Sequence, residues 1–126
     1  MRTNFMTYRG VRICVLDFTH VSDDDTALAA IEEAKSVITR QRTKSVYTLT
    51  DVTGSRVTPR IRTALLELTK ANAPYVVAGA VVGLTSIQMI ILRGIIQLTR
   101  RRLVALSSRE KALEHLAAEA TGDGKA

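Results

Sequence analysis

The chain has 126 residues, which is enough for one domain of ordinary size and too few for a second full one. With 46% hydrophobic residues, 24% charged residues, seven glycines and two prolines, its composition excludes a disordered, collagen-like or low-complexity chain. Its net charge of +6 comes entirely from the second half, because residues 1–55 carry seven basic and seven acidic side chains.

Strand-like and helix-like segments alternate along the chain after an opening hairpin that turns at Arg9 and Gly10. In chain order we expect strands over 3–8 and 11–18, a helix over 23–41, a strand over 45–50, a helix from Thr58 to Asn72, a strand over 75–84, a helix over 86–99, a strand over 103–106, and a helix that starts at Ser107 and stops before Gly122. The predicted fold is therefore α/β: a single small domain over 1–121 with a mixed, mostly parallel sheet of about five strands, about four helices and the order β-β-α-β-α-β-α-β-α. Residues 122–126 are expected to be a frayed tail.

Each expected helix begins with a side chain that can cap it. These are the acidic run 23–25, Thr58 before Pro59, Thr85 with Gln88, and Ser107 with Glu110. Capping explains the acidic run without a bound metal ion. No metal site is expected elsewhere, because His20 and His115 are isolated and no second cysteine accompanies Cys14.

One segment, 71–92, contains no charged residue over 22 positions, and a membrane-spanning helix needs about 20 apolar residues. Its β-branched first half followed by the Thr85–Gln88 capping pair predicts a buried strand, a turn and a helix instead. We therefore expect no transmembrane segment. The N-terminus also lacks the apolar core of a signal peptide, so we expect a cytoplasmic protein.

No pattern in the sequence nominates a catalytic residue or a cofactor. Glycine-rich phosphate loops and nucleophile elbows are absent, and Cys14 lies in an apolar run that predicts a buried thiol. We accordingly expect a protein that is not an enzyme and that needs no cofactor.

The most informative loop follows the third expected strand, so it lies at the carboxyl edge of the predicted parallel sheet, where open α/β sheets hold ligands. We expect a partner-binding loop here, formed by Asp51, Thr53, Gly54, Ser55 and Arg56. A hydroxyl in this turn would be exposed, and Gly54 would permit tight backbone geometry beside it. The plain alternative is an ordinary turn rich in threonine and glycine.

Three stretches carry a family resemblance that extends over about residues 5–118. They are 50–54 (TDVTG), the run from Pro74 through 80–84 (AVVGL), and 113–116 (LEHL). Together with the element order, they resemble STAS domains, the fold of anti-sigma-factor antagonists and of the cytoplasmic domains of sulfate transporters. The sequence is most similar to the SpoIIAA-like branch, often labelled STAS/SEC14 in bacterial proteins.

The resemblance implies a regulatory role. In antagonists the loop reads Asp-Ser-Ser/Thr-Gly and its last hydroxyl is phosphorylated by a partner kinase, which makes Thr53 the implied phospho-acceptor. Val52 stands where a serine is usual. The implied partner is a protein, such as a serine/threonine kinase or an anti-sigma-like regulator.

The expected helix over 86–99 is apolar around much of its circumference, which is typical of a helix covered on more than one side. Its core stripe is predicted to be Ile87, Ile90, Ile91, Ile95 and Leu98. A second face, for a homodimer contact or a ligand, is predicted at Met89, Leu92, Arg93 and Ile96. The alternative is a helix packed deeply by the C-terminal helix.

Three functions follow from these patterns. The first is a bacterial regulatory module that binds a protein partner, and the second is a carrier for a small apolar or anionic, lipid-like ligand beneath 86–99. The third, nucleic-acid binding through Arg100, Arg101 and Arg102, is the least favoured, because aromatic residues make up only 4% of the chain.

Overall fold

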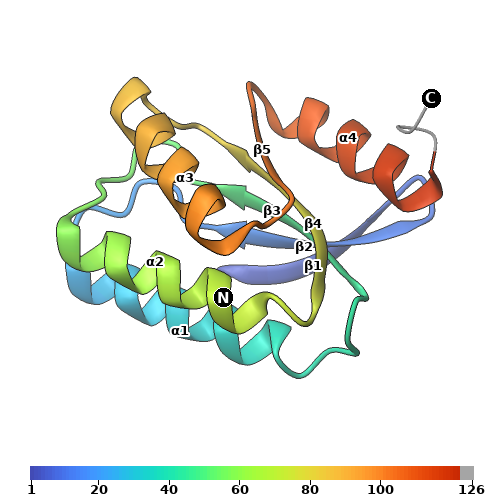
Figure 1. Ribbon diagram of the computed structural model, residues 1–126, viewed down its shortest axis with the longest axis horizontal. Helices are drawn as coiled ribbons and strands as arrows, with labels where there is room; N and C mark the ends of the chain where they lie inside the picture. Colours follow the sequence, from blue (N-terminus) through green and yellow to red (C-terminus); the bar gives the residue numbers. More distant parts are fainter. Residues whose placement is uncertain (123–126) are drawn as a thin grey trace.

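A computed structural model describes residues 1–122 (Figure 1). Its elements are β1 (Thr3–Tyr8), β2 (Val11–Asp17), α1 (Asp24–Ile38), β3 (Val46–Asp51), α2 (Pro59–Asn72), β4 (Val76–Val82), α3 (Ser86–Thr99), β5 (Leu103–Leu106) and α4 (Arg109–Thr121). This order confirms the predicted fold class. Of the tail expected at 122–126, residues 123–126 lie outside the described part, and Gly122 caps α4.

The five strands form one sheet in the order β1-β2-β3-β4-β5. β1 pairs with β2 in antiparallel fashion through the hairpin, and every later pairing is parallel. Because the parallel strands lie side by side in chain order, the loops after β2, β3 and β4 all emerge at the same edge of the sheet.

Helices cover both faces of the sheet, as Figure 1 shows. α1, α2 and α3 lie on one face, and α4 lies alone on the other. The first face buries the larger hydrophobic core, which includes Phe18, Ile31 and Leu68. The second face buries a smaller core, in which Leu116 of α4 packs with residues such as Ile13 and Leu49.

The helix starts follow the capping pattern in three of four cases. Asp23 accepts from the backbone N–H of Thr26, Thr58 accepts from Ile61, and Thr85 forms a full capping box with Gln88. The prediction for α4 was wrong by one residue, since the side chain of Ser108, not Ser107, accepts from the N–H of Lys111. α1 also ends at Ile38, short of the predicted residue 41.

The uncharged segment 71–92 is divided among the end of α2, the buried strand β4, a turn and the first half of α3. Within residues 1–122, no helix combines the length and apolar character needed to cross a membrane. β4 is uncharged because helices cover it on both sides, which is typical of a central parallel strand.

Cys14 lies in β2 with none of its surface exposed. Burial raises the pKa of its thiol to about 12, so almost none of the reactive thiolate is present near neutral pH. We expect iodoacetamide at pH 8 to leave the native protein unlabelled and to label it once denatured. Native labelling as fast as labelling of the denatured chain would show that β2 opens readily.

Candidate functional site

The expected partner-binding loop, residues 51–56, lies at the carboxyl edge of the sheet, beside the loop that follows β2. Asp17 and Asp51 are register partners at the ends of β2 and β3. Thr53, Gly54 and Arg56 are exposed, Ser55 is half-buried, and Asp51 is buried. Val52 points into the core, which explains an apolar residue at that position.

Two identical turns stand next to each other at this edge. Thr53 donates its hydroxyl to Oδ1 of Asp51 at 2.6 Å, and its backbone N–H donates to the same oxygen at 3.0 Å. After β2, Thr19 makes the same two bonds to Oδ1 of Asp17, at 2.6 and 3.1 Å. Each carboxylate therefore folds the chain back over its own strand end and holds a threonine hydroxyl at a defined position.

Arg109, the first residue of α4, reaches this edge from the face of the sheet that α4 covers. Its Nε donates to Oδ2 of Asp51 at 2.7 Å, and its Nη2 lies 3.9 Å from Oδ1 of Asp17. Burial opposes ionisation of Asp51, but the hydrogen bonds from Thr53 and Arg109 outweigh it and hold the pKa of Asp51 below its usual range. Asp51 is thus an ionised, buried carboxylate that organises the edge.

Ser55 and Gln88 attach the rest of the 51–56 loop to its neighbours. The Ser55 hydroxyl donates to the carbonyl of Phe18 and accepts from the N–H of Val21 at 2.9 Å. Its carbonyl accepts from the side-chain amide of Gln88 in α3 at 2.9 Å. The loop is therefore held by the segment after β2, by α3 and by α4, which gives its exposed residues a defined shape.

Two glycines allow close packing around Thr53. A Cβ on Gly54 would lie 2.3 Å from Nδ1 of His20, so the imidazole packs directly on that glycine. A Cβ on Gly83, which follows β4, would lie 2.6 Å from the backbone nitrogen of Thr53. Both glycines have positive φ angles, +73° and +85°, which L side chains rarely adopt.

Sequence reasoning did not assign Arg109, His20, Asp17 or Thr19 to this site. The repeated Asp-x-Thr pattern at 17–19 and 51–53 was the available signal for two of them. Nothing in the sequence indicates that Arg109 crosses to this edge, because that contact depends on which face of the sheet α4 covers.

The predicted stripe of α3 was wrong in part. Ile95 is buried, but Ile87, Ile90 and Leu98 are 73%, 66% and 71% exposed. α3 is rotated about its axis so that its capping residue Gln88 faces inward and bonds to Ser55. Leu92, one turn further along the helix, lies on the same side and is buried in the core.

The predicted second face of α3 is divided by this rotation. Arg93 is exposed, Met89 and Ile96 are half-buried, and Leu92 is only 8% exposed, so Leu92 is not a surface contact. The exposed apolar surface of α3 is formed by Ile87, Ile90 and Leu98 instead.

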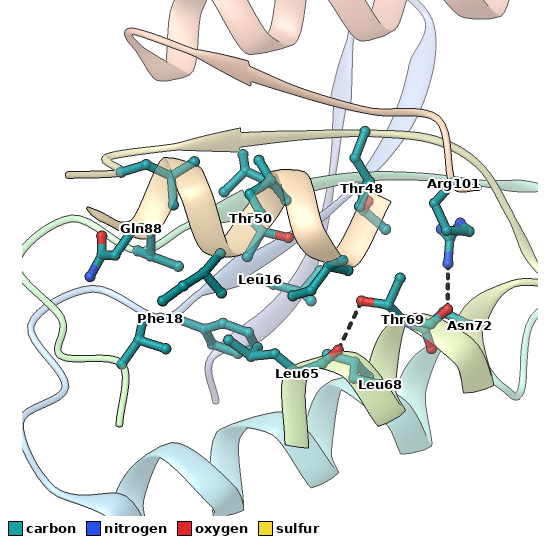
Figure 2. Close-up of a pocket in the computed structure, with 18 of the residues that line it drawn as sticks. Leu16, Phe18, Thr48, Thr50, Leu65, Leu68, Thr69, Asn72, Gln88 and Arg101 are labelled. Carbon is teal, nitrogen blue, oxygen red and sulfur yellow. Dashed lines mark hydrogen bonds between the residues drawn. The ribbon is translucent and has the colours of Figure 1, made fainter. Parts of the chain in front are cut away.

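A pocket of about 100 Å³ lies beneath α3, between that helix, α2 and the sheet. Most of its wall is apolar, and Leu92 and Ile95 of α3 are among the residues that line it. Figure 2 shows Gln88 at one end and Arg101, Thr69 and Asn72 gathered at the other.

The basic cluster 100–102 does not act as one surface. Arg100 is exposed in a left-handed conformation at the end of α3, and Arg102 pairs with Glu119 at 2.6 Å. Arg101 turns to the pocket and donates from Nη1 to the carbonyl of Thr69 at 2.6 Å. Burial lowers the pKa of the Arg101 guanidinium.

A solved structure with the same architecture is an uncharacterised protein of the DUF3478 family with a SpoIIAA-like fold, from Shewanella loihica PV-4. It matches with a TM-score of 0.70 and 13% sequence identity over 90% of this chain and 91% of that one. This chain has a SpoIIAA-like fold. An anti-sigma-factor antagonist (STAS) domain protein from Planctomyces limnophilus also matches, with a TM-score of 0.54 and 13% identity over 91% of this chain and 97% of that one.

No protein-family model and no curated protein matches the sequence. The two solved structures confirm the predicted STAS-like fold. At 13% sequence identity they show the fold alone. Within residues 1–122 of this SpoIIAA-like fold, no three His, Cys, Asp or Glu side chains are grouped to hold a metal ion.

Proposed function

We propose that this protein is a non-enzymatic regulatory module of the bacterial cytoplasm that binds a protein partner through the 51–56 loop. The observation that carries the proposal is that Thr53 is exposed and held in place by hydrogen bonds. Its side chain is exposed, while its backbone and hydroxyl are positioned by the buried carboxylate of Asp51. A preorganised exposed loop loses little conformational freedom on binding, which favours affinity.

Phosphorylation of Thr53 is the proposed switch. A phosphate would remove the hydroxyl proton that Thr53 donates to Asp51 and place about −1.5 to −2 charges beside that carboxylate. The guanidinium of Arg109 already bonds to Asp51, so it is the cation positioned to respond to the added charge. The expected consequence is a change in the shape and charge of the 51–56 loop that a partner detects.

The partner-binding surface is tested by comparing three baits in a lysate of the native host: the wild type, Thr53→Asp and Thr43→Asp. Thr43 is an exposed threonine in the loop before β3, at the opposite edge of the sheet, so its variant adds the same charge elsewhere. We expect a protein that the wild type and Thr43→Asp retain and that Thr53→Asp loses at least about tenfold. Equal retention by all three baits would contradict the proposal.

The phosphorylation switch has a separate test, which is peptide mass spectrometry of the protein purified from its own host. We expect phosphate on Thr53 and none on Thr19, because Thr53 is exposed whereas Thr19 is half-buried. A protein that carries no modification at Thr53 under any growth condition would rule out the switch and leave the partner-binding proposal to its own test.

A homodimer through α3 stays a prediction, with its contact moved from Met89 to the exposed side chains Ile87, Ile90 and Leu98. Apolar side chains exposed together on one helix are typical of an interface. We expect Ile90→Asp to convert a dimer to a monomer in sedimentation velocity without changing the circular dichroism spectrum. A wild-type protein that sediments as a monomer would contradict the prediction.

A second candidate function is a carrier for a small ligand, and the pocket beneath α3 is the observation that favours it. The pocket is apolar, is partly open and has a volume of about 100 Å³. An apolar cavity of this order can hold a small hydrophobic molecule, as an engineered cavity of about 150 Å³ holds benzene.

A further inference from the structure

The pocket beneath α3 is apolar along its walls and polar at one end. Leu92, Ile95 and Val81 contribute to its walls, from α3 and β4. The polar end is formed by Arg101, Thr69 and Asn72, which Figure 2 shows on the side away from Gln88. A ligand that fills this space must therefore be amphipathic, with its polar group at the Arg101 end.

Asn72 provides the first indication that this end can bind a polar group. Its side chain is only 5% exposed, and its Oδ1 has no hydrogen-bond partner within residues 1–122. A buried polar atom without a partner is destabilising, so such atoms are rare in folded proteins. A side-chain amide can also turn to present its NH₂ group, which would let Asn72 donate to a ligand oxygen.

Arg101 provides the second, independent sign. One of its N–H groups bonds to the carbonyl of Thr69, and a guanidinium has five. No carboxylate lies within 4.0 Å of it in the described part of the chain, which leaves a half-buried positive charge without an anion. The planar guanidinium matches a carboxylate group, to which it can donate two parallel hydrogen bonds.

We propose that the pocket binds a short aliphatic carboxylate, with its chain among the apolar walls and its carboxylate between Arg101 and Asn72. This assignment rests on the second proposed function, the carrier, and names its ligand class. The volume of about 100 Å³ is smaller than the cavity of about 150 Å³ that holds benzene, so it limits the part of the ligand held inside to about four to six non-hydrogen atoms. Hexanoate has this chemistry, and because the pocket is partly open the remaining atoms of its chain can extend out of it.

The test titrates the wild-type protein with sodium hexanoate and, separately, with hexan-1-ol, while amide chemical shifts are followed by NMR. The two probes share a chain and differ in charge. We expect hexanoate to bind at least about tenfold more tightly than hexan-1-ol, because hydrogen bonds between charged groups are stronger than neutral ones. Hexanoate should also shift the amide signals of Leu92, Val81 and Arg101. Tighter or equal binding of hexan-1-ol would overturn the carboxylate assignment and leave the carrier in place.

If neither probe binds, both the carboxylate assignment and the carrier fail, whereas the proposal for the 51–56 loop is unaffected. Arg101→Gln should weaken hexanoate about tenfold and leave hexan-1-ol unchanged. Its control, Arg100→Gln, removes the same charge from the neighbouring exposed residue and should change neither affinity. An equal loss in both variants would overturn the assignment, because it would show a general charge effect.

Discussion

Gly83→Ala is expected to destabilise the protein by at least about 3 kcal/mol, a large share of the stability of a domain this size. Gly83 has φ of +85°, where an L residue costs about 1–2 kcal/mol. The new Cβ would also lie 2.6 Å from the nitrogen and 2.7 Å from Cα of Thr53. Because these are backbone atoms, the clash cannot be relieved by rotating a side chain, so the 51–56 loop must move.

Thermal unfolding measures this loss, and amide NMR shifts should show that the largest displacement is at Thr53. The control is Gly94→Ala. A Cβ on Gly94, in the middle of α3, meets nothing within 4 Å, and alanine is the better helix former by about 1 kcal/mol. That variant should be as stable as the wild type or more so. Gly83→Ala with unchanged stability would contradict the packing of the β4–α3 turn against Thr53.

Asp51→Asn is expected to cost about 2 kcal/mol, because it removes the charge from a buried group that accepts hydrogen bonds from Thr53 and Arg109. Arg109 is half-exposed, so solvent reduces its share of this loss. Urea unfolding at pH 7 measures the effect. Glu67→Gln removes the same charge from an exposed residue in the middle of α2 and should change the unfolding free energy by less than about 0.5 kcal/mol.

The cost of Asp51→Asn should also depend on pH in a defined direction. The pKa of Asp51 is lower in the folded protein than in the unfolded chain, where it is about 3.9. Its contribution to stability is therefore complete above about pH 5 and is lost as the pH falls through the folded pKa. We expect the difference between wild type and variant to be constant from pH 5 to 8 and to shrink below pH 4. A difference that grows on acidification would contradict an ionised Asp51.

The fold could be predicted from the sequence because its signals are local. The hairpin turn, the Thr58–Pro59 helix start and the Thr85–Gln88 capping box each depend on residues close together in the chain, and all three are present in the structure. The position of the 51–56 loop followed from the alternation of strands and helices, since parallel strands end at the same edge of a sheet.

The rotation of α3 and the position of Arg109 could not be predicted, because they depend on contacts between residues that are distant in the chain. The stripe of α3 was assigned from hydrophobicity alone, and α3 is so rich in isoleucine that several rotations bury a similar area. The bond from Gln88 to Ser55 accompanies the rotation that exposes Ile87 and Ile90, and it joins residues 33 positions apart. The contact of Arg109 with Asp51 joins residues 58 positions apart, so it could not be predicted from the sequence either.

Hydrogen–deuterium exchange of the protein, with and without the partner captured by the wild-type bait, tests most directly whether that partner binds at the 51–56 loop. We predict that binding slows exchange most strongly in peptides covering residues 51–58 and the start of α2, and leaves α4 beyond Arg109 unchanged. Protection confined to α3 or to the C-terminal half of α4, with none across 51–58, would contradict the account.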